Sequence, residues 1–215
     1  MADPTDSPDL VPSPQAMRIA LGRFATSVTI ITCADAQGRW TGLTVNSFAA
    51  LSLAPPLVLW SLRLASPSLG AFRAARHFAV NVLADTQVEM SRRFASPQDD
   101  KFGAGHWTAG HGGAPVLSGC SAVFECEVQA QHEGGDHWLF IGQVLRVDDQ
   151  GVAPLLFQAG HYHLLGEILC AHFSVMLPTR NGWLISLRCS SSAVCSRATP
   201  ARSCQRVNPG RCCRA

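Results

Sequence analysis

A succession of short apolar runs, rich in β-branched and aromatic residues and separated by turn-forming residues, constrains the fold of this chain most strongly. The runs lie at about residues 27–34, 39–48, 55–62, 78–83, 120–131 and 137–147, and an apolar segment follows at 154–165. The links are short: DAQG joins the first two runs, and HEGG joins the last two as a hairpin. This pattern predicts a mostly β protein whose strands pair antiparallel and close into a barrel.

A few helices are expected beside the strands. Ser13, followed by a proline, is a suitable N-cap, and apolar residues recur at helical spacing over about 14–24. We expect this helix to lay its apolar face on the core. Thr86 and Glu89 have the spacing of a capping box, which predicts a surface helix over 87–94.

The composition indicates one folded domain. The chain has 215 residues, of which 47% are hydrophobic and 15% charged, enough to bury one sizeable core. No apolar run reaches the roughly 18 residues that span a bilayer. The first residues are acidic and proline-rich, unlike a secretory signal. We therefore expect a cytoplasmic protein that binds no membrane and has a flexible lead over 1–13.

The chain changes character near residue 168. All 15 acidic residues and ten of the 17 basic residues lie at or before Glu167, whereas the remainder holds seven arginines, no acid and six of the nine cysteines. The cysteine spacing contains no C-x₂₋₄-C pair for zinc, and no aromatic residue for base stacking follows Trp183. We expect a domain over 14–167, then a poorly ordered basic extension over 168–215, and no nucleic-acid partner.

Metal binding and nucleophilic catalysis have little support in the sequence. His161 and His163 fall on one side of a strand, which is half a metal site at best, and His106 and His111 lie in a glycine-rich loop. No G-x-S-x-G motif is present. The cysteines of the domain sit in apolar strand patterns, where a small buried side chain is the usual role. We therefore expect no metal.

Two hydroxyl-rich stretches are better candidates for a binding site. TGLTVNSF places Thr, Asn and Ser side chains around a glycine, and SLRLASPSLG leads into an expected helix. Ser66 is the expected N-cap of this helix, which should begin at Pro67 and turn Leu69 and Phe72 inward. Hydroxyls and backbone N–H groups at a helix start suit an anion, although each stretch alone is equally typical of a turn.

Six motifs occur in an order that resembles the flavin reductase family of FMN-binding split barrels. They are ALGRFATSVTIIT, GLTVNSFAALSLAPPLVLWSL, HFAVNVLA, SRRFASPQDDKF, FECEV and GGDHWLFIGQVLRV, within about residues 14–166. Members are reductase components of two-component flavin-dependent monooxygenases. The resemblance implies a six-stranded antiparallel split barrel with a few flanking helices. It also implies a homodimer that binds FMN or FAD and takes hydride from NADH or NADPH.

The resemblance also implies where the flavin binds. The segment along the isoalloxazine would be Thr41, Gly42, Leu43, Thr44, Val45, Asn46 and Ser47. Ser61, Leu62 and Arg63 would flank the ring and the ribityl chain. Pro67 and Ser68 would hold the phosphate, with Arg93 and Phe94 closing that side.

The dinucleotide site follows from the GGDH motif. By resemblance, His137 is the catalytic-site residue that contacts the nicotinamide cofactor and helps to place its C4 against flavin N5. Gly134, Gly135 and Asp136 complete this motif; the alternative is that they merely end a hairpin. Tyr162 would either flank the nicotinamide or pack in the core. Lys101 would either contact a phosphate or remain a solvated charge.

Two functions remain open. The first is an NAD(P)H:flavin oxidoreductase that supplies reduced flavin by diffusion to a partner monooxygenase. The second is a non-enzymatic flavin-binding or electron-carrier module on the same barrel, which would need no dinucleotide motif. The sequence does not decide between FMN and FAD or between NADH and NADPH.

Overall fold

The computed structural model of the chain describes residues 12–166, 178–179 and 182–183. Residues 12–166 form the domain considered below, and the remaining described residues are two short strands, β13 (Pro178–Thr179) and β14 (Gly182–Trp183), which pair with each other. The expected lead over 1–13, except its last two residues, and the rest of the extension over 168–215 lie outside the described residues. None of the described helices is long and apolar enough for a membrane crossing.

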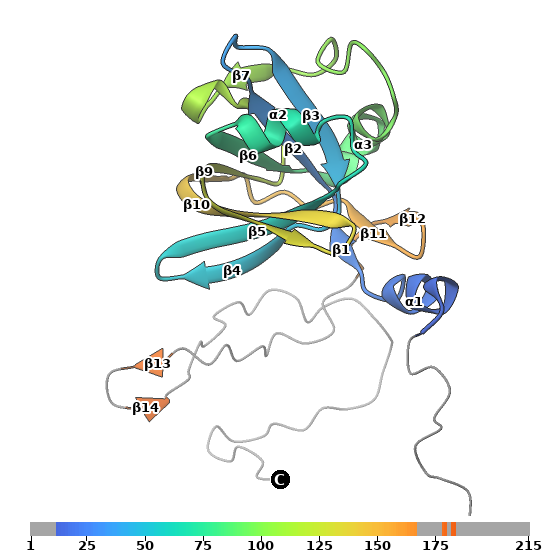
Figure 1. The fold of residues 1–215 in the computed structure, drawn as a ribbon. Helices are drawn as coiled ribbons and strands as arrows, with labels where there is room; N and C mark the ends of the chain where they lie inside the picture. The colour runs from blue at the N-terminus through green and yellow to red at the C-terminus, as the bar shows by residue number, and fades with distance from the viewer. Residues whose placement is uncertain (1–11, 167–177, 180–181, 184–215) are drawn as a thin grey trace, which may run out of the picture. The chain divides into compact units, whose positions relative to one another are not determined.

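The domain is mostly β, as predicted, with three short α-helices (Figure 1). Its elements are α1 (Pro14–Leu21), β1 (Thr26–Ser27), β2 (Thr29–Ala34), β3 (Trp40–Val45), β4 (Ala49–Leu53), β5 (Pro56–Arg63), α2 (Leu69–Ala74), β6 (His77–Val82), η1 (Asp85–Gln87), α3 (Val88–Ala95), β7 (Trp107–Ala109), η2 (His111–Gly113), β8 (Pro115–Leu117), β9 (Ala122–Gly134), β10 (His137–Asp149), β11 (Leu156–Gln158) and β12 (His161–His163).

The main sheet has seven antiparallel strands in the order β3-β2-β6-β9-β10-β5-β4. Smaller sheets are formed by β1-β11-β12 and by the hairpin β7-β8, which lies inside the stretch expected to be a loop. The seventh strand of the main sheet is β4, which the sequence pattern did not separate from the run at 39–48. The strand pattern predicted a closed barrel, and this was wrong, because within the described residues β3 and β4 each pair on one side only. The barrel is split between them.

The long hairpin β9-β10 gives the main sheet its curvature. β6 pairs with the first half of β9, residues 122–127, whereas β5 pairs with the first half of β10, residues 137–143. These segments lie toward opposite ends of the hairpin, because residues 137–143 of β10 face residues 127–134 of β9. Register shifts in β10 at Ile141/Gly142 and Val144/Arg146 locally increase the bend. The sheet therefore folds over itself and encloses a core.

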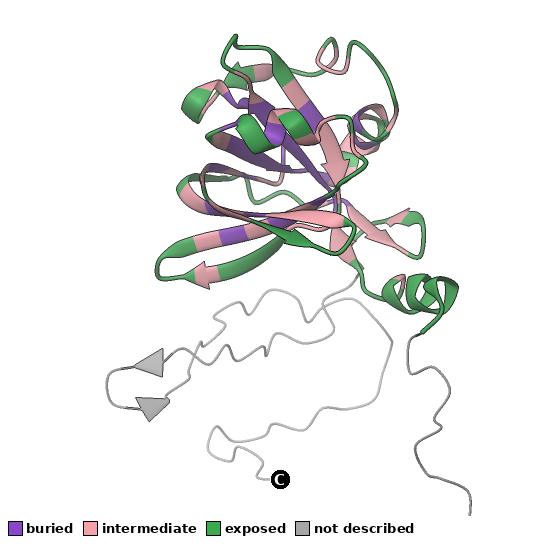
Figure 2. Ribbon diagram, in the orientation of Figure 1, coloured by how far each residue is buried: buried purple, intermediate pink, exposed green. Residues whose placement is uncertain are grey.

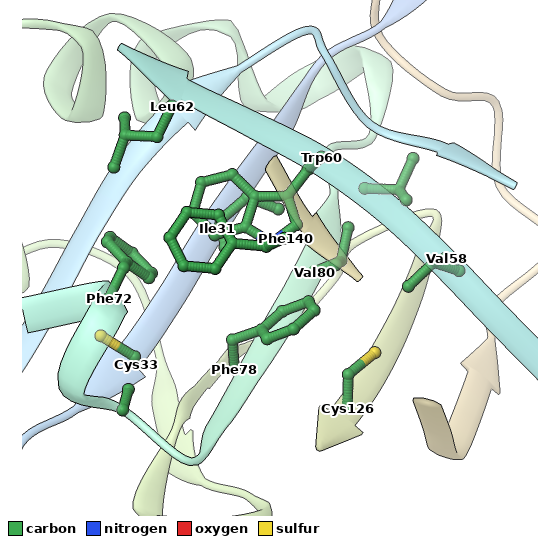
Figure 3. Close-up of a cluster of buried hydrophobic side chains, with 12 residues drawn as sticks. Ile31, Cys33, Val58, Trp60, Leu62, Phe72, Phe78, Val80, Cys126 and Phe140 are labelled. Carbon is green, nitrogen blue, oxygen red and sulfur yellow. The ribbon is translucent and has the colours of Figure 1, made fainter. Parts of the chain in front are cut away.

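The strands around this core carry the buried residues (Figure 2), and an aromatic cluster fills it (Figure 3). Trp60 of β5 and Phe140 of β10 stack with ring centroids 4.4 Å apart and an interplanar angle of 8°. Phe72 of α2 and Phe78 of β6 meet the Trp60 ring edge-on. Aromatic contacts of this kind add about 0.5–1.5 kcal/mol per pair beyond burial of their area. They tie the two halves of the curved sheet together.

Helix α1 begins as the sequence predicts, but its apolar side is exposed. The Ser13 hydroxyl accepts a hydrogen bond from the Ala16 N–H at 3.2 Å, and the helix ends at Leu21, three residues earlier than expected. The expected packing on the core is wrong, since Leu21 and the following Phe24 are 59% and 74% exposed and no residue of α1 is buried. The spacing of apolar residues predicted the helix, but it did not determine whether this apolar side packs on the core of the domain.

The other two helices start differently from the prediction. Helix α2 begins at Leu69 rather than at Pro67, and the Ser66 hydroxyl accepts from the Ser68 N–H at 3.3 Å inside the preceding turn. Phe72 is buried as expected. The capping box of Thr86 and Glu89 does not form. Instead, the Gln87 side-chain oxygen accepts from the Ala84 N–H at 2.9 Å, because a turn of 3₁₀ helix over 85–87 precedes α3.

Candidate functional site

A cavity of about 410 Å³ lies where the end of β3, the end of β5 and the start of β10 converge. Its lining combines apolar side chains with hydroxyl, amide and basic groups. The lining residues are Leu43, Thr44, Val45, Asn46, Ser47, Ser61, Leu62, Arg63, Ala65, Ser66 and His137. Nine of these eleven were predicted as site residues from the sequence.

Hydrogen bonds fix the strands that line the cavity. The Ser47 hydroxyl donates to the Ser61 carbonyl at 2.8 Å and accepts from the Ser61 N–H at 3.1 Å, which joins the end of β3 to β5. The Thr44 hydroxyl donates to the Ser91 carbonyl of α3 at 2.7 Å. These two hydroxyls are therefore committed to the protein, and the predicted contact with a cofactor is left to other groups of the lining.

The available polar groups are those without a partner in the described part of the chain, namely the Asn46 amide, the Ser61 hydroxyl and the Arg63 guanidinium. In addition, β3 is an edge strand, which among the described residues pairs with β2 alone. An edge strand leaves alternate backbone N–H and C=O groups unpaired. The site thus offers both backbone and side-chain hydrogen bonds beside the apolar surface of Leu43 and Val45.

His137 reaches the cavity because of the turn before it. Gly135 has φ +63°, a left-handed conformation that favours glycine, and the two-residue turn 135–136 sets His137 opposite Gly134 in β9. The Asp136 carbonyl accepts from the Leu64 N–H at 2.9 Å, which anchors the turn to the end of β5. His137 then pairs across the ladder with Arg63, the last residue of β5.

The lining carries the guanidinium of Arg63 and the imidazole of His137, while no acidic side chain lines the cavity in the described region. Asp136 lies just outside, with Oδ1 2.7 Å from His137 Nδ1. The hydrogen bond from His137 and, more weakly, the charge of Arg63 hold the pKa of Asp136 below its usual range. A phosphate or another anion would meet favourable charge at this mouth.

Two predicted cofactor residues, Gly42 and Phe94, pack against each other outside the cavity lining. Phe94 is 1% exposed and sits among Phe102 and Trp107. A Cβ atom on Gly42 would lie 2.8 Å from the Phe94 ring. This contact explains the glycine by packing of α3 on β3, without any ligand. Thr41, the neighbouring predicted residue, faces Cys33 of β2 in the ladder and also lies outside the lining.

Arg93 and Lys101 hold the loop that follows α3. Arg93 donates from Nε to the Lys101 carbonyl at 2.8 Å and from Nη2 to the Asp100 carbonyl. Lys101 Nζ donates to the Phe94 carbonyl at 3.0 Å, which satisfies the C-terminal end of the helix, and burial lowers the pKa of this lysine. The structure therefore assigns Lys101 a helix-terminal contact, and Arg93 does not line the cavity.

Tyr162 also lies away from the cavity lining. Its hydroxyl is 2.9 Å from the Ser91 hydroxyl, and its ring packs against Phe157. This contact fastens β12 to α3, which in turn holds Thr44 of the cavity wall. The remaining predicted residues do not line the cavity; they are Pro67, Ser68, Gly134, Gly135 and Asp136.

The sequence reasoning missed Ala65 as a lining residue, whereas Ser66 belonged to the hydroxyl-rich stretch that was expected to suit an anion. Ala65 lies between Arg63 and Pro67, which were predicted, so its position within that stretch was the available signal. Elsewhere in the described residues, no three His, Cys, Asp or Glu side chains form a group that could hold a metal ion. Burial raises the pKa of the Cys33, Cys120 and Cys126 thiols to about 12, so they remain protonated.

Comparison with known proteins places these features in a family. The model of the flavin reductase like domain matches residues 21–166. A probable flavin reductase of Rhizobium meliloti (strain 1021) is 42% identical over 149 residues, which cover 69% of this chain and 48% of the relative. This chain therefore spans about half of that relative's length. The reductase subunit HsaB of a flavin-dependent monooxygenase from Rhodococcus jostii (strain RHA1) is 43% identical over 150 residues, 69% of this chain and 76% of that protein.

A solved structure agrees with the sequence relatives. An NADH:FAD oxidoreductase of Streptomyces globisporus C-1027, in complex with NAD and FAD fragments, superposes with a TM-score of 0.69 and 31% identity. The similarity covers 79% of this chain and 99% of that one. The split-barrel fold predicted from the sequence is confirmed by these neighbours. The family model, the relatives and the shared fold together show that this chain belongs to the flavin reductase family.

Proposed function

We propose that this chain is an NAD(P)H:flavin oxidoreductase that reduces FMN or FAD and supplies the reduced flavin to a partner monooxygenase. The observation that carries the proposal is the meeting of residues 43–47, residues 61–63 and His137 in one cavity. Flavin and dinucleotide must approach each other for hydride transfer. The resemblance assigned residues 43–47 and 61–63 to the flavin and His137 to the dinucleotide, so their meeting in one cavity is what this reaction needs. Relatives named flavin reductase, FMN reductase (NADH) and monooxygenase reductase subunit support the same activity.

The lining fits a flavin and a nicotinamide cofactor. Leu43, Val45 and Leu62 offer apolar surface for a planar ring, and Asn46 and Ser61 offer hydrogen bonds to its polar edges. When both cofactors are bound, hydride passes directly from the reduced nicotinamide to the flavin.

The protein contributes orientation and charge. Arg63 is available to neutralise a phosphate, and His137 orients the dinucleotide from the hairpin turn. No acid or base catalysis by a side chain is required. The two committed hydroxyls, Ser47 and Thr44, keep the cavity walls at a fixed separation.

The names of the relatives and the exposed surface support proposals on the finer properties. The names of relatives that specify a dinucleotide specify NADH, which we propose as the preferred donor. We further propose a homodimer, because Leu21, Phe24 and Leu53 expose large apolar side chains. Residues 14–167 would be the reductase domain, with 168–215 as an extension. Delivery of reduced flavin by diffusion places reductase and monooxygenase in one compartment, which we propose is the cytoplasm.

The direct test is oxidation of NADH by the purified full chain, followed at 340 nm in air with FMN or FAD added. We expect turnover that requires flavin, saturates with NADH and persists in a chelator such as EDTA. NADPH in place of NADH measures the donor preference, and FMN against FAD measures the flavin preference.

Two results would contradict the proposal. Flavin binding, seen as quenching of flavin fluorescence, without NADH oxidation would support the electron-carrier alternative. Activity that is lost with EDTA and restored by zinc would mean that histidines hold a catalytic metal.

A further inference from the structure

Asp136 was predicted to bind a cofactor, yet its side chain does not reach the cavity. It is 79% exposed and is absent from the lining, whereas the adjacent His137 side chain lines the cavity. The contact that Asp136 does make is with His137, through Oδ1 and Nδ1 at 2.7 Å. The imidazole is therefore the side chain that links this carboxylate to the cavity.

The contact determines which ring nitrogen of His137 carries the proton. An ionised carboxylate only accepts hydrogen bonds, so Nδ1 must be the donor. The pKa of Asp136 is held low, chiefly by this hydrogen bond, so the carboxylate stays ionised at neutral pH. In the neutral imidazole the proton on Nδ1 leaves Nε2 with a lone pair.

The surroundings hold this arrangement in place. The Asp136 carbonyl is bonded to the Leu64 N–H, and His137 is the first residue of β10, opposite Arg63 of β5 and Gly134 of β9. Both residues of the pair are thus anchored through their backbones on the same short turn. The guanidinium of Arg63 is the other charged group that faces the pair across the ladder.

We propose that Asp136 is a positioning residue that holds His137 as the Nδ1-protonated tautomer, so that Nε2 accepts a hydrogen bond from the carboxamide NH₂ of the nicotinamide ring. This inference rests on the proposed reductase activity. It names the atom of His137 that meets the dinucleotide and the chemical group that this atom selects. Nicotinamide offers a donor of this kind in its carboxamide, which the tautomer with the proton on Nε2 could not accept.

The first test reads the tautomer without any turnover. Long-range ¹H–¹⁵N spectra of the full chain labelled with ¹⁵N-histidine distinguish a proton on Nδ1 from one on Nε2, and the His137→Ala spectrum assigns the signals. We expect the Nδ1-protonated form in the wild type and its loss in Asp136→Ala. A wild-type signal with the proton on Nε2 would overturn the proposal.

The second test separates positioning from direct contact by a double-mutant cycle. Asp136→Ala should raise KM for NADH about two- to twelvefold, the effect of one hydrogen bond, with kcat at saturation and flavin affinity unchanged. Asp136→Ala should add nothing in a His137→Ala background. Asp136→Asn, which retains an acceptor oxygen, should restore part of the affinity. Additive effects would show that Asp136 binds the dinucleotide itself.

The third test asks whether the carboxamide is the selected group. Reduced 3-acetylpyridine adenine dinucleotide carries a methyl in place of the NH₂, so its KM should be raised in the wild type and insensitive to Asp136→Ala. Glu133→Ala is the matched control, since Glu133 is an exposed acid of the same hairpin that does not line the cavity. It should leave both KM values unchanged.

The outcomes distinguish the inference from the activity on which it rests. Failure of the wild type to oxidise NADH with flavin would refute the proposed function. Wild-type turnover with an unchanged NADH KM in Asp136→Ala would refute only the positioning role. A lower melting temperature of Asp136→Ala with unchanged KM would show that the pair merely stabilises the hairpin.

Discussion

At the scale of single residues, His137 is the side chain whose replacement best separates the two cofactor sites. His137→Ala should raise KM for NADH about two- to twelvefold, because one hydrogen bond in a partly hydrated cavity is worth roughly 0.5–1.5 kcal/mol. Flavin affinity should stay within about threefold, since the residues assigned to the flavin lie on β3 and β5. The measurements are NADH saturation kinetics and quenching of flavin fluorescence.

His132→Ala is the matched control for His137→Ala. His132 lies on β9 of the same hairpin, is exposed and does not line the cavity. It should behave as the wild type in both titrations. A loss of flavin binding in His137→Ala with an unchanged KM for NADH would mean that this histidine serves the other cofactor.

Replacement of Gly142 should destabilise the fold, because the core leaves no room for a side chain at this position. A Cβ atom would overlap the Phe78 ring and lie 3.1 Å from Cys126 Cβ, and both neighbours are buried. Overpacking of this kind costs about 1–3 kcal/mol. Gly142→Ala should therefore lower the melting temperature by roughly 2–4 °C for each kcal/mol lost.

Gly70→Ala is the control for this thermal unfolding experiment. Nothing lies within 4 Å of a Cβ built at Gly70, and the residue is in α2. Alanine favours a helix over glycine, so this variant should keep or raise the melting temperature. Equal melting temperatures for Gly142→Ala and the wild type would show that the aromatic core moves aside.

At the scale of elements, the sequence predicts what local chemistry determines. The N-cap at Ser13, the hairpin formed by the last two long runs and the inward Phe72 are all confirmed, because each depends on neighbours a few residues away. The turn of this hairpin lies at 135–136 rather than over 132–135, because residues 132–134 still pair as part of β9. The capping box at Thr86 failed because Thr86 lies inside the 3₁₀ turn over 85–87, and the Gln87 side chain caps the start of that turn at the Ala84 N–H. Several helix-start patterns of similar strength overlap in that stretch.

Hydrogen bonds connect β3 to α3, and no sequence motif predicted them. The Thr44 hydroxyl donates to the Ser91 carbonyl, and the Ser91 hydroxyl forms a hydrogen bond with the Tyr162 hydroxyl. Thr44→Val keeps the shape of the side chain and removes the hydrogen bond, so it should destabilise folding by about 0.5–1.5 kcal/mol. Because residue 44 lines the cavity, flavin affinity should fall as well.

Urea unfolding and flavin titration measure the two effects of Thr44→Val. Thr108→Val on β7 is the control, since its side chain is exposed and replacement should change stability little. If Thr44→Val lowers stability but leaves flavin affinity intact, the α3 contact supports the fold and not the cavity wall.

At the scale of the whole molecule, the site joins segments that are distant in the sequence. Residues 43–47 precede His137 by more than half the length of the domain and residues 61–66 by a little less than half, and the curvature of β9-β10 is what brings β5 and the hairpin turn together. The family resemblance predicted that these segments form one site, whereas the periodicity of apolar residues did not. Resemblance could not show that Phe94, Arg93 and Tyr162 face other partners, because a motif preserves residue order and not side-chain direction.

The exposed apolar side of α1 leads to the last prediction, on assembly. Met17 and Leu21, one helical turn apart, are 48% and 59% exposed, which is unusual for large side chains on a short helix. If a second copy covers them, the double variant Met17→Gln and Leu21→Gln should weaken the dimer while the domain stays folded. Light scattering after size exclusion should then give the 23.0 kDa mass of one chain at concentrations where the wild type gives twice that mass.

Val152→Gln is the control for assembly, because Val152 is 46% exposed in a loop and the substitution changes polarity in the same way. It should remain dimeric. A wild type that elutes as a single chain would refute the homodimer. A double variant that stays dimeric would place the interface on another exposed apolar surface, of which the β4 edge with Leu53, 83% exposed, is the next to test. Circular dichroism of each variant shows whether the β fold persists, so that loss of assembly is not mistaken for unfolding.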